Sequence, residues 1–199
     1  MAIHIFYIHG FNSSPQSAKA QVMGRFLAQH YPDYRYHVPE LPFSPEGAVD
    51  ILCRAIEPCL PETVYLLGSS MGGFYGTYAA ERYGLPLAMI NPAVNPDVLV
   101  QLFMGEQIND YTGERYTFTP EHVDIFRSLS PEITQPARYL LLTQTGDETL
   151  DYREGIERYR NSPQIVEQGG SHGFDNFEEH LPGIMEFFQT SSNQKNQSA

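Results

Sequence analysis

The short segment Gly68-Ser69-Ser70-Met71-Gly72 has the residue types and spacing of a site that presents a nucleophile. It directly follows the apolar run Thr63 to Leu67 and precedes a segment with helical spacing. Glycines two positions before and two positions after a serine allow a tight strand-to-helix turn that strains the serine backbone and exposes its hydroxyl. Ser70 has both glycines, whereas Ser69 has Leu67 in place of the first. We therefore predict that Ser70 is a nucleophile.

A base for this serine is found near the end of the chain. A serine hydroxyl becomes a strong nucleophile when a neighbouring histidine removes its proton. His172 lies in the glycine-rich stretch "GGSHGF", which follows the apolar run Gln164 to Glu167. Reactive residues in an open parallel sheet gather beyond the carboxyl ends of the strands. We therefore expect His172 to meet Ser70 at that end of the sheet.

The acid that would orient this histidine has three candidates. Asp147 lies in "QTGDE", shortly after the apolar run Arg138 to Thr143, and Glu148 and Asp151 follow it closely. Asp151 also suits the first turn of the next predicted helix, where negative charge is favoured. We predict Asp147 as the acid and keep Glu148 and Asp151 as alternatives. The resulting chain order of serine, aspartate and histidine is that of a hydrolase triad.

Two backbone N–H groups could stabilise the negatively charged oxygen that forms when a serine attacks a carbonyl group. One belongs to Met71, directly after the nucleophile at the start of a predicted helix. The other lies in the stretch "HGFNSS", where Gly10 allows a close approach and Phe11 is the expected donor. His9 is expected to be a structural hydrogen-bonding group and not a catalyst.

Strands that alternate with helices would bring these residues together. Apolar runs predict strands at Ile3 to Ile8, Tyr36 to Leu41, Thr63 to Leu67, Leu87 to Ile90, Arg138 to Thr143 and Gln164 to Glu167. Start signals and helical spacing predict helices from Ser14-Pro15 to His30, from Ser44-Pro45 to Cys59, and over Met71 to Tyr83, Leu150 to Tyr159 and Asn176 to Gln189. Such alternation predicts an α/β fold with a mostly parallel sheet of about six strands and helices on both faces.

Residues 93–135 depart from this alternation. They place aromatic side chains among turn residues, and an insertion of this length between two strands is typically a lid or a binding loop. Phe103 and Met104 from this insertion, with Phe74 from the helix after Ser70, are candidates for an apolar substrate pocket. The insertion's aromatic side chains could equally pack into a satellite core.

The chain has the size and composition of one globular domain. Its 199 residues, 41% of them hydrophobic, can bury one sizeable core. We assign this domain to residues 1–189, with the 93–135 insertion inside it. Residues 190–199 are polar and lack an apolar period, which predicts a disordered tail.

The net charge argues against two classes of partner. The chain has 24 acidic and 12 basic residues, a net charge of -12. Nucleic acids and anionic membrane surfaces attract basic side chains, so we expect neither as a partner. The N-terminal segment has no basic region or cleavage site of a signal peptide, and its apolar run is too short to span a bilayer. We therefore expect a cytoplasmic location.

Four motifs in order carry a family resemblance. The stretches "YIHGFNSSP", "LLGSSMGGFYG", "QTGDE" and "GGSHGF" resemble those of the α/β-hydrolase superfamily, and more closely those of the small bacterial YqiA-like esterases. The resemblance covers almost the whole chain up to the tail. It implies a three-layer α/β-hydrolase fold and a carboxylic ester hydrolase with Ser70 as nucleophile, Asp147 as acid and His172 as base. The chain opens on the strand before "HGF", without the antiparallel strands common in the superfamily, so we expect a smaller sheet.

The leading functional hypothesis is hydrolysis of a small-molecule acyl ester through an acyl-enzyme, with no metal and no organic cofactor. A thioesterase would use the same triad on an acyl thioester. Hypotheses from other classes are a non-catalytic binding module with this fold and a hydrolase of carbon–carbon or peptide bonds. The presence of all three triad residues disfavours the binding module, and labelling with a serine-directed fluorophosphonate would separate it from an enzyme.

Overall fold

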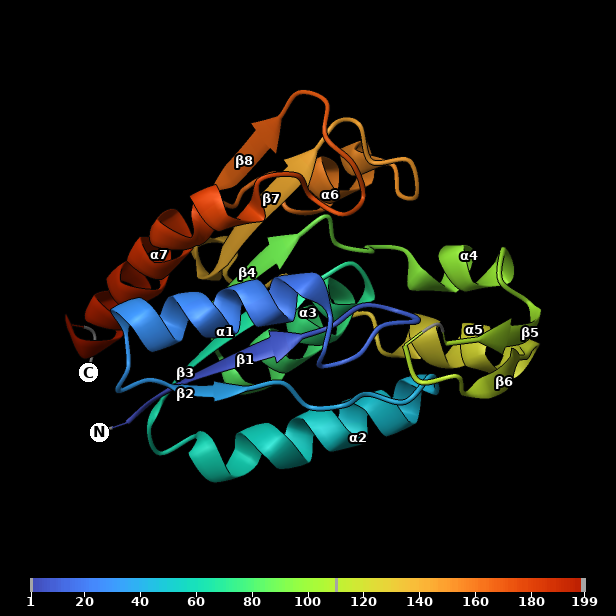
Figure 1. Cartoon of the computed structure of the whole chain (residues 1–199), viewed down its shortest axis with the longest axis horizontal. Helices are drawn as coiled ribbons and strands as arrows, with labels where there is room; N and C mark the ends of the chain where they lie inside the picture. The colour runs from blue at the N-terminus through green and yellow to red at the C-terminus, as the bar shows by residue number, and fades with distance from the viewer. Residues whose placement is uncertain (1, 110, 198–199) are drawn as a thin grey trace.

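The computed structural model describes residues 2–109 and 111–197, with side chains up to residue 192. At its centre lies a sheet of six strands, all parallel, in the order β2-β1-β3-β4-β7-β8 (Figure 1). The strands are β1 (Ile3–Ile8), β2 (Arg35–His37), β3 (Thr63–Ser69), β4 (Leu87–Ile90), β7 (Tyr139–Gln144) and β8 (Gln164–Glu167). The predicted α/β fold with about six strands is confirmed.

Helices cover both faces of this sheet because successive strand residues point to opposite faces. The helices are α1 (Ala18–His30) and α7 (Phe177–Gln197) on one face, and α2 (Pro45–Ile56), α3 (Met71–Tyr83) and α6 (Tyr152–Arg158) on the other (Figure 1). On β1, Ile5 and Tyr7 pack with α1 and α7, whereas Phe6 and Ile8 join the core on the other face. Two apolar cores therefore fix the sheet whose strand ends carry the predicted chemistry.

Two predicted boundaries, at the first helix and at the second strand, are wrong. Ser14-Pro15 forms a turn before α1 and does not begin it, because the Ser14 hydroxyl accepts a hydrogen bond from the Gln16 N–H at 3.0 Å. Strand β2 ends at His37 and not at Leu41, since Pro39 has no N–H to continue the ladder. The late start of α1 places its first turn beside the end of β1.

The insertion at residues 93–135 lies beyond the carboxyl ends of the central strands (Figure 1). Its elements are α4 (Pro96–Gln101), β5 (Gly105–Ile108), β6 (Arg115–Phe118) and α5 (Pro120–Ser128). Strands β5 and β6 form an antiparallel pair. Phe118 and Phe126 are buried in the main core, so the insertion is packed onto the domain and is not a free loop.

The final helix is longer than its composition predicts. The predicted end at Gln189 and the predicted disorder of residues 190–197 are wrong, because α7 continues to Gln197; residues 198–199 lie outside the described residues. Phe188 stacks on the Tyr65 ring at a centroid distance of 4.8 Å, and the Tyr65 hydroxyl is hydrogen-bonded to that of Ser192 at 2.6 Å. Neither α7 nor any other described helix combines the length and apolarity needed to cross a bilayer.

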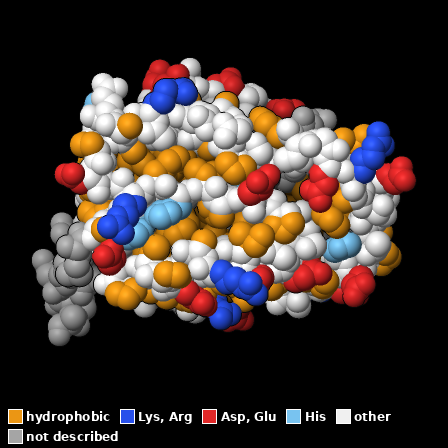
Figure 2. Space-filling model, turned by 60° about the horizontal axis from the view of Figure 1, so that its bottom comes forward, with side chains coloured by type: hydrophobic (Ala, Val, Ile, Leu, Met, Phe, Trp, Pro, Cys, Tyr) orange, Lys and Arg blue, Asp and Glu red, His pale blue; other side chains and the backbone are white. Residues whose placement is uncertain are grey.

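Charged side chains lie in small separate groups over the face that carries α2, with apolar side chains between them (Figure 2). Arg54 on α2, for example, pairs with Asp50 at 3.0 Å, and both side chains are more than half exposed. Exposed pairs of this kind contribute about 0–1 kcal/mol to stability. The acidic excess on this face is therefore dispersed and forms no single charged patch.

The turn between β3 and α3 is packed so tightly that it excludes side chains. A Cβ on Gly72 would lie 1.9 Å from the carbonyl oxygen of Ile8, and a Cβ on Gly68 would lie 2.4 Å from the carbonyl oxygen of Gly72. Both obstacles are backbone atoms, so relief would require moving β1 or α3 as a whole. The glycine frame around Ser70 is thus required by close contacts between elements.

We predict that Gly72→Ala lowers the free energy of unfolding by more than about 3 kcal/mol, since overpacking against movable side chains already costs about 1–3 kcal/mol. The control is Gly183→Ala in α7, where a Cβ meets nothing within 4 Å. That change should stabilise the protein by up to about 1 kcal/mol through helix propensity. Urea denaturation measures both, and equal effects would contradict the tight approach at the turn.

Candidate active site

Ser70 is held in a strained backbone conformation at the start of α3. Its φ of 55° and ψ of -124° are unusual for a residue with a side chain, and such strain costs about 1–3 kcal/mol. Its N–H donates to the Ile90 carbonyl at 3.0 Å, and its own carbonyl accepts from the N–H groups of Gly73 and Ala93 at 2.9 and 3.0 Å. These bonds to α3 and to the end of β4 offset the strain and fix the side chain.

The structure brings Ser70, His172 and Asp147 into one hydrogen-bonded chain. The Ser70 Oγ lies 3.1 Å from Nε2 of His172, and Nδ1 of the same ring lies 2.9 and 3.0 Å from the two carboxylate oxygens of Asp147. In the tautomer that suits this arrangement, Nδ1–H donates to the carboxylate and Nε2 accepts from the serine hydroxyl. The Asp147 side chain is 1% exposed and that of His172 is 23% exposed, so only the histidine faces incoming molecules.

Asp147 is oriented by backbone groups of its own loop. Its Oδ1 accepts hydrogen bonds from the N–H groups of Thr149 and Leu150 at 2.9 and 2.8 Å. A carboxylate with these partners is satisfied while buried, so it can remain close to the histidine ring without an unpaired oxygen. Its position after β7 places it next to the loop that follows β8, because β7 and β8 are paired neighbours.

The two alternative acids have other partners. Glu148 accepts a hydrogen bond from the backbone N–H of His172 at 2.9 Å, and this bond lowers the pKa of the Glu148 carboxyl. Asp151 caps the start of α6 by accepting from the Arg153 N–H at 3.0 Å, and it also pairs with the Arg153 guanidinium at 2.7 Å. Of the three candidates, Asp147 is the one hydrogen-bonded to the histidine ring.

Phe11 and Met71 both present backbone N–H groups near the serine. Within the described residues neither N–H has a hydrogen-bond acceptor, and Met71 begins α3. A Cβ on Gly10 would lie 3.1 Å from the Ser70 Cβ, which is how closely this loop approaches the serine. Both positions fit donors to an oxyanion.

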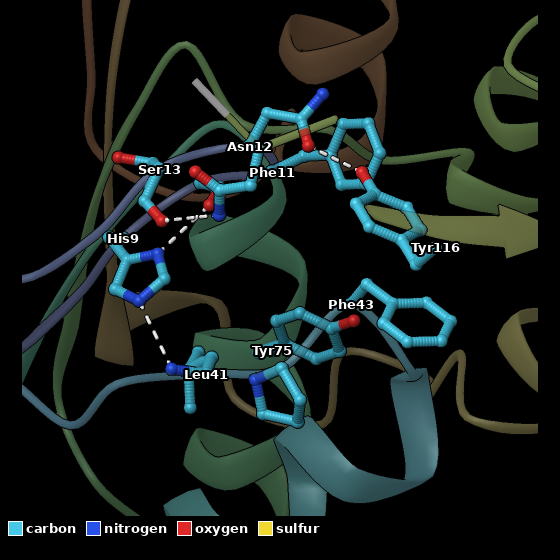
Figure 3. A pocket seen from close by; sticks show the side chains of 11 residues that line it. His9, Phe11, Asn12, Ser13, Leu41, Phe43, Tyr75 and Tyr116 are labelled. Atoms are coloured by element: carbon cyan, nitrogen blue, oxygen red, sulfur yellow. Dashed lines mark hydrogen bonds between the residues drawn. The ribbon is translucent and has the colours of Figure 1, made fainter. Parts of the chain in front are cut away.

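His9 fixes the loop that carries Phe11 (Figure 3). One ring nitrogen accepts from the Leu41 N–H at 3.1 Å, and the other donates to the Gly10 carbonyl at 2.9 Å. Burial lowers the pKa of His9, which favours the neutral ring that this pattern requires. The structural role expected for this histidine agrees with its contacts.

Comparison with known protein families identifies the chain. The model of the family described as "Uncharacterised protein family (UPF0227)" matches residues 4–189. The chain belongs to the UPF0227 family. This match confirms the resemblance to the YqiA-like group, which the order of the four sequence motifs had indicated.

Solved structures with the α/β-hydrolase fold resemble this UPF0227 protein over most of its length. Est1E from Butyrivibrio proteoclasticus, solved with ferulic acid, has a TM-score of 0.69 at 15% identity and covers 96% of this chain and 89% of its own. XC6422 from Xanthomonas campestris is described as an α/β serine hydrolase without a lid. It has a TM-score of 0.65 at 13% identity and covers 92% of this chain and 81% of its own. An esterase domain from Rhodothermus marinus has a TM-score of 0.63 at 16% identity and covers 96% of this chain and 86% of its own. These likenesses confirm the predicted fold.

Two buried amides that the sequence did not single out hold the His172 loop of this UPF0227 protein. Asn91, at the end of β4 with a φ of 40°, donates from Nδ2 to the carbonyls of Ser171 and His172 at 2.9 and 3.2 Å. Gln144, at the end of β7, accepts at Oε1 from the N–H groups of Ser171 and Asp175 at 3.1 and 2.8 Å. Both are polar residues that lie at the carboxyl ends of strands. That position is the one sequence signal that could have identified them.

The insertion is tied to the same loop that carries Phe11. The Tyr116 hydroxyl donates to the Asn12 side-chain oxygen (Figure 3), and the Asn109 amide donates to the Ser13 carbonyl at 3.2 Å. Asn109 also accepts from the Tyr111 N–H at 2.9 Å, which shapes the turn between β5 and β6. These hydrogen bonds from the insertion hold the loop that carries Phe11 in place beside Ser70.

A cavity of about 370 Å³, here called the triad cavity, opens beside the serine. It is lined by Ser70 and His172, by the loop from Gly10 to Ser13, by the first turn of α1 and by Tyr111. The three residues predicted to contact the substrate do not line this cavity. Phe74 is buried in the core against Phe126, and neither Phe103 nor Met104 lines this cavity. Helix orientation, which composition does not specify, turns Phe74 inward.

One group of side chains among the described residues could offer ligands to a metal ion. Nitrogens of His4 and His37 and the sulfur of Cys59 lie within 4.8 Å of one another. Hydrogen bonds already occupy these histidines, at 2.9 Å between the rings and at 2.7 Å from His4 to Glu62. His4 is the second residue of β1 and Glu62 precedes β3, so the group lies toward the opposite end of the sheet from Ser70 and makes no contact with it.

We predict that Asn91→Ala loosens the loop after β8. The variant leaves two carbonyl groups without their donor, a loss of about 1–3 kcal/mol for buried groups. Amide hydrogen exchange in residues 168–175 should accelerate by about tenfold or more, which corresponds to about 1.4 kcal/mol. Asn95→Ala is the control, because Asn95 is exposed and makes no side-chain capping bond. Unchanged exchange in the Asn91 variant would contradict the anchoring role.

Proposed function

We propose that this protein is a serine esterase that hydrolyses carboxylic esters of small molecules through an acyl-enzyme. The observation that carries the proposal is the unbroken hydrogen-bond chain from Ser70 through His172 to Asp147, built on a strained strand-to-helix turn. Strain of this kind persists at sites where it positions a reactive group. The arrangement satisfies the geometric roles of nucleophile, base and orienting acid.

In the first half of the reaction, the Ser70 Oγ would attack the ester carbonyl carbon while His172 Nε2 takes the hydroxyl proton. The buried Asp147 carboxylate stabilises the resulting imidazolium, at a distance of 2.9 Å from Nδ1. The carbonyl oxygen becomes an oxyanion and accepts hydrogen bonds from the free N–H groups of Phe11 and Met71. The carbon–oxygen bond to the leaving alcohol then breaks, and the alcohol takes the proton from His172.

In the second half, a water molecule replaces the alcohol. His172 removes a proton from this water, and the hydroxide oxygen forms a bond to the acyl carbon. Collapse of the second tetrahedral intermediate breaks the bond to Ser70, which recovers its proton from the histidine. The balance is one ester and one water consumed, one acid and one alcohol released, with no oxidant or reductant.

The structural relatives support this reaction class. Est1E was solved with ferulic acid bound, the Rhodothermus marinus relative is an esterase domain, and XC6422 is described as a serine hydrolase. A purely binding module would have no use for a buried carboxylate aligned on a histidine. An acyl thioester would meet the same three groups in the same order, so a panel of oxygen esters and thioesters of several chain lengths decides between the two.

We predict that Ser70→Ala lowers ester hydrolysis by about 10⁴- to 10⁶-fold without unfolding the protein, since triad members act as a unit. The fold should persist because Ser70 already adopts its positive φ with a Cβ present. Ser69→Ala is the matched control and should change the rate by less than about tenfold. Fluorophosphonate labelling with mass spectrometry locates the reactive serine; modification of Ser69 instead would overturn the assignment.

We predict that Asp147→Asn lowers kcat by about 10⁴-fold, the scale seen when a triad histidine loses the carboxylate that sets its tautomer. Asp151→Asn should change kcat by less than about tenfold, because Asp151 bonds to Arg153 and to the start of α6. Both variants are measured with a saturating short-chain ester. A strong loss confined to the Asp151 variant would show that the acid is misassigned.

A further inference from the structure

The triad cavity contains a cationic side chain that the proposed mechanism does not use. Lys19 is the second residue of α1 and one of only two lysines in the chain. Its ammonium donates to the Gly173 carbonyl at 2.8 Å, directly after His172. The same side chain lines the cavity that holds Ser70. A positive charge is therefore located within the space that a substrate would enter.

The position of Lys19 goes against the local preference of a helix. The first turn of a helix carries partial positive charge, which favours acidic side chains and disfavours lysine, and α1 has no acidic residue in its first turn. Partial burial lowers the pKa of Lys19, while the negative charge of Asp147 opposes that lowering. No carboxylate in the described part of the chain lies within ion-pair distance of its ammonium. Local helix stability does not explain a lysine here.

The described lining of the triad cavity has no negative charge to offset that of Lys19. Its lining, as far as the structure describes it, contains no acidic side chain, although the chain as a whole has 24 acidic residues. Tyr111 also lines the cavity, and its exposed side chain adds a neutral hydroxyl to the polar groups there. The volume of about 370 Å³ is near the lower end of the about 300–1,000 Å³ typical for small-molecule sites. A small ester bound at Ser70 would therefore have its remaining groups close to Lys19.

We propose that Lys19 forms an anion subsite and that the preferred substrates are small esters carrying a negatively charged group, a carboxylate in the simplest case, near the scissile bond. The inference rests on the proposed function, because it places the ester carbonyl at Ser70. The ammonium uses one of its donors on Gly173 and has further donors for the substrate. A charge-assisted hydrogen bond in a partly desolvated cavity then favours charged over neutral substrates.

The test compares esters that differ only by charge. Monopropyl glutarate and propyl glutaramate place a carboxylate or an isosteric amide on the acyl side, and O-butyryl glycolate and O-butyryl glycolamide do so on the alcohol side. The ratio of kcat/KM for charged over neutral ester is measured for the wild-type protein, Lys19→Met, Lys19→Arg and Arg25→Met. Arg25 lies on the exposed side of the same helix, so its variant makes the same charge change away from the cavity.

The wild-type protein should prefer the charged member of one pair by about ten- to a hundredfold, from the about 1.5–3 kcal/mol of a hydrogen bond to a charged group. Lys19→Met should abolish that ratio mainly through KM, Lys19→Arg should retain much of it, and Arg25→Met should leave it unchanged. Added salt should reduce the wild-type ratio.

Two results would overturn the subsite. One is that the wild-type protein shows no preference within either pair. The other is that Lys19→Met slows both members equally, as expected if Lys19 only holds the His172 loop. Hydrolysis of the neutral esters that is lost in Ser70→Ala would, in either case, leave the proposed function standing. Absence of any Ser70-dependent ester hydrolysis would contradict the proposed function and the subsite together.

Discussion

The contact between the start of α3 and the end of β1 is the constraint on which the site depends. Because Gly72 has no side chain, the helix can lie against the Ile8 carbonyl, where a Cβ would come within 1.9 Å. This approach forces Ser70 into its strained turn and directs the first N–H of the helix toward the loop after β1. Gly10 brings that loop to the serine from the other side. Ser70 and the N–H groups proposed as oxyanion donors are thus positioned by the same backbone packing.

Asp147 and His172 are positioned mainly by hydrogen bonds, together with one close backbone contact, since a Cβ on Gly146 would lie 2.4 Å from the Gly170 carbonyl oxygen. The loop after β8 is irregular, and its N–H and carbonyl groups would be unsatisfied without partners from neighbouring strands. Gln144 supplies both kinds, since its amide donates to the Asp175 carbonyl and its oxygen accepts from the N–H groups of Ser171 and Asp175. Asn91 supplies donors from the next strand. The parallel order β4-β7-β8 places these amides side by side at the strand ends.

Local patterns predict most of the fold and the three triad positions, because each depends on a short window of sequence. The glycine frame specifies the serine turn, and apolar runs specify which residues follow strands. The rest depends on contacts between distant segments. The extended α7 is stabilised by the stacking of Phe188 on Tyr65, and the inward direction of Phe74 follows from how α3 meets the insertion at Phe126. The bonds from Asn91 to the loop after β8 likewise join segments that lie far apart in the sequence.

The distribution of charge is compatible with the anionic substrate that we propose for this acidic protein. A net charge of -12 repels anions at long range, but salt screens exposed charges beyond about 8 Å under physiological conditions. Inside the triad cavity the described lining carries Lys19 and no carboxylate, and partial desolvation strengthens its interactions. The buried Asp147 charge is engaged by His172 and by two backbone N–H groups, which limits its repulsion of a bound anion. In this proposal, selectivity is decided within the cavity, while the surface charge affects mainly the rate of encounter.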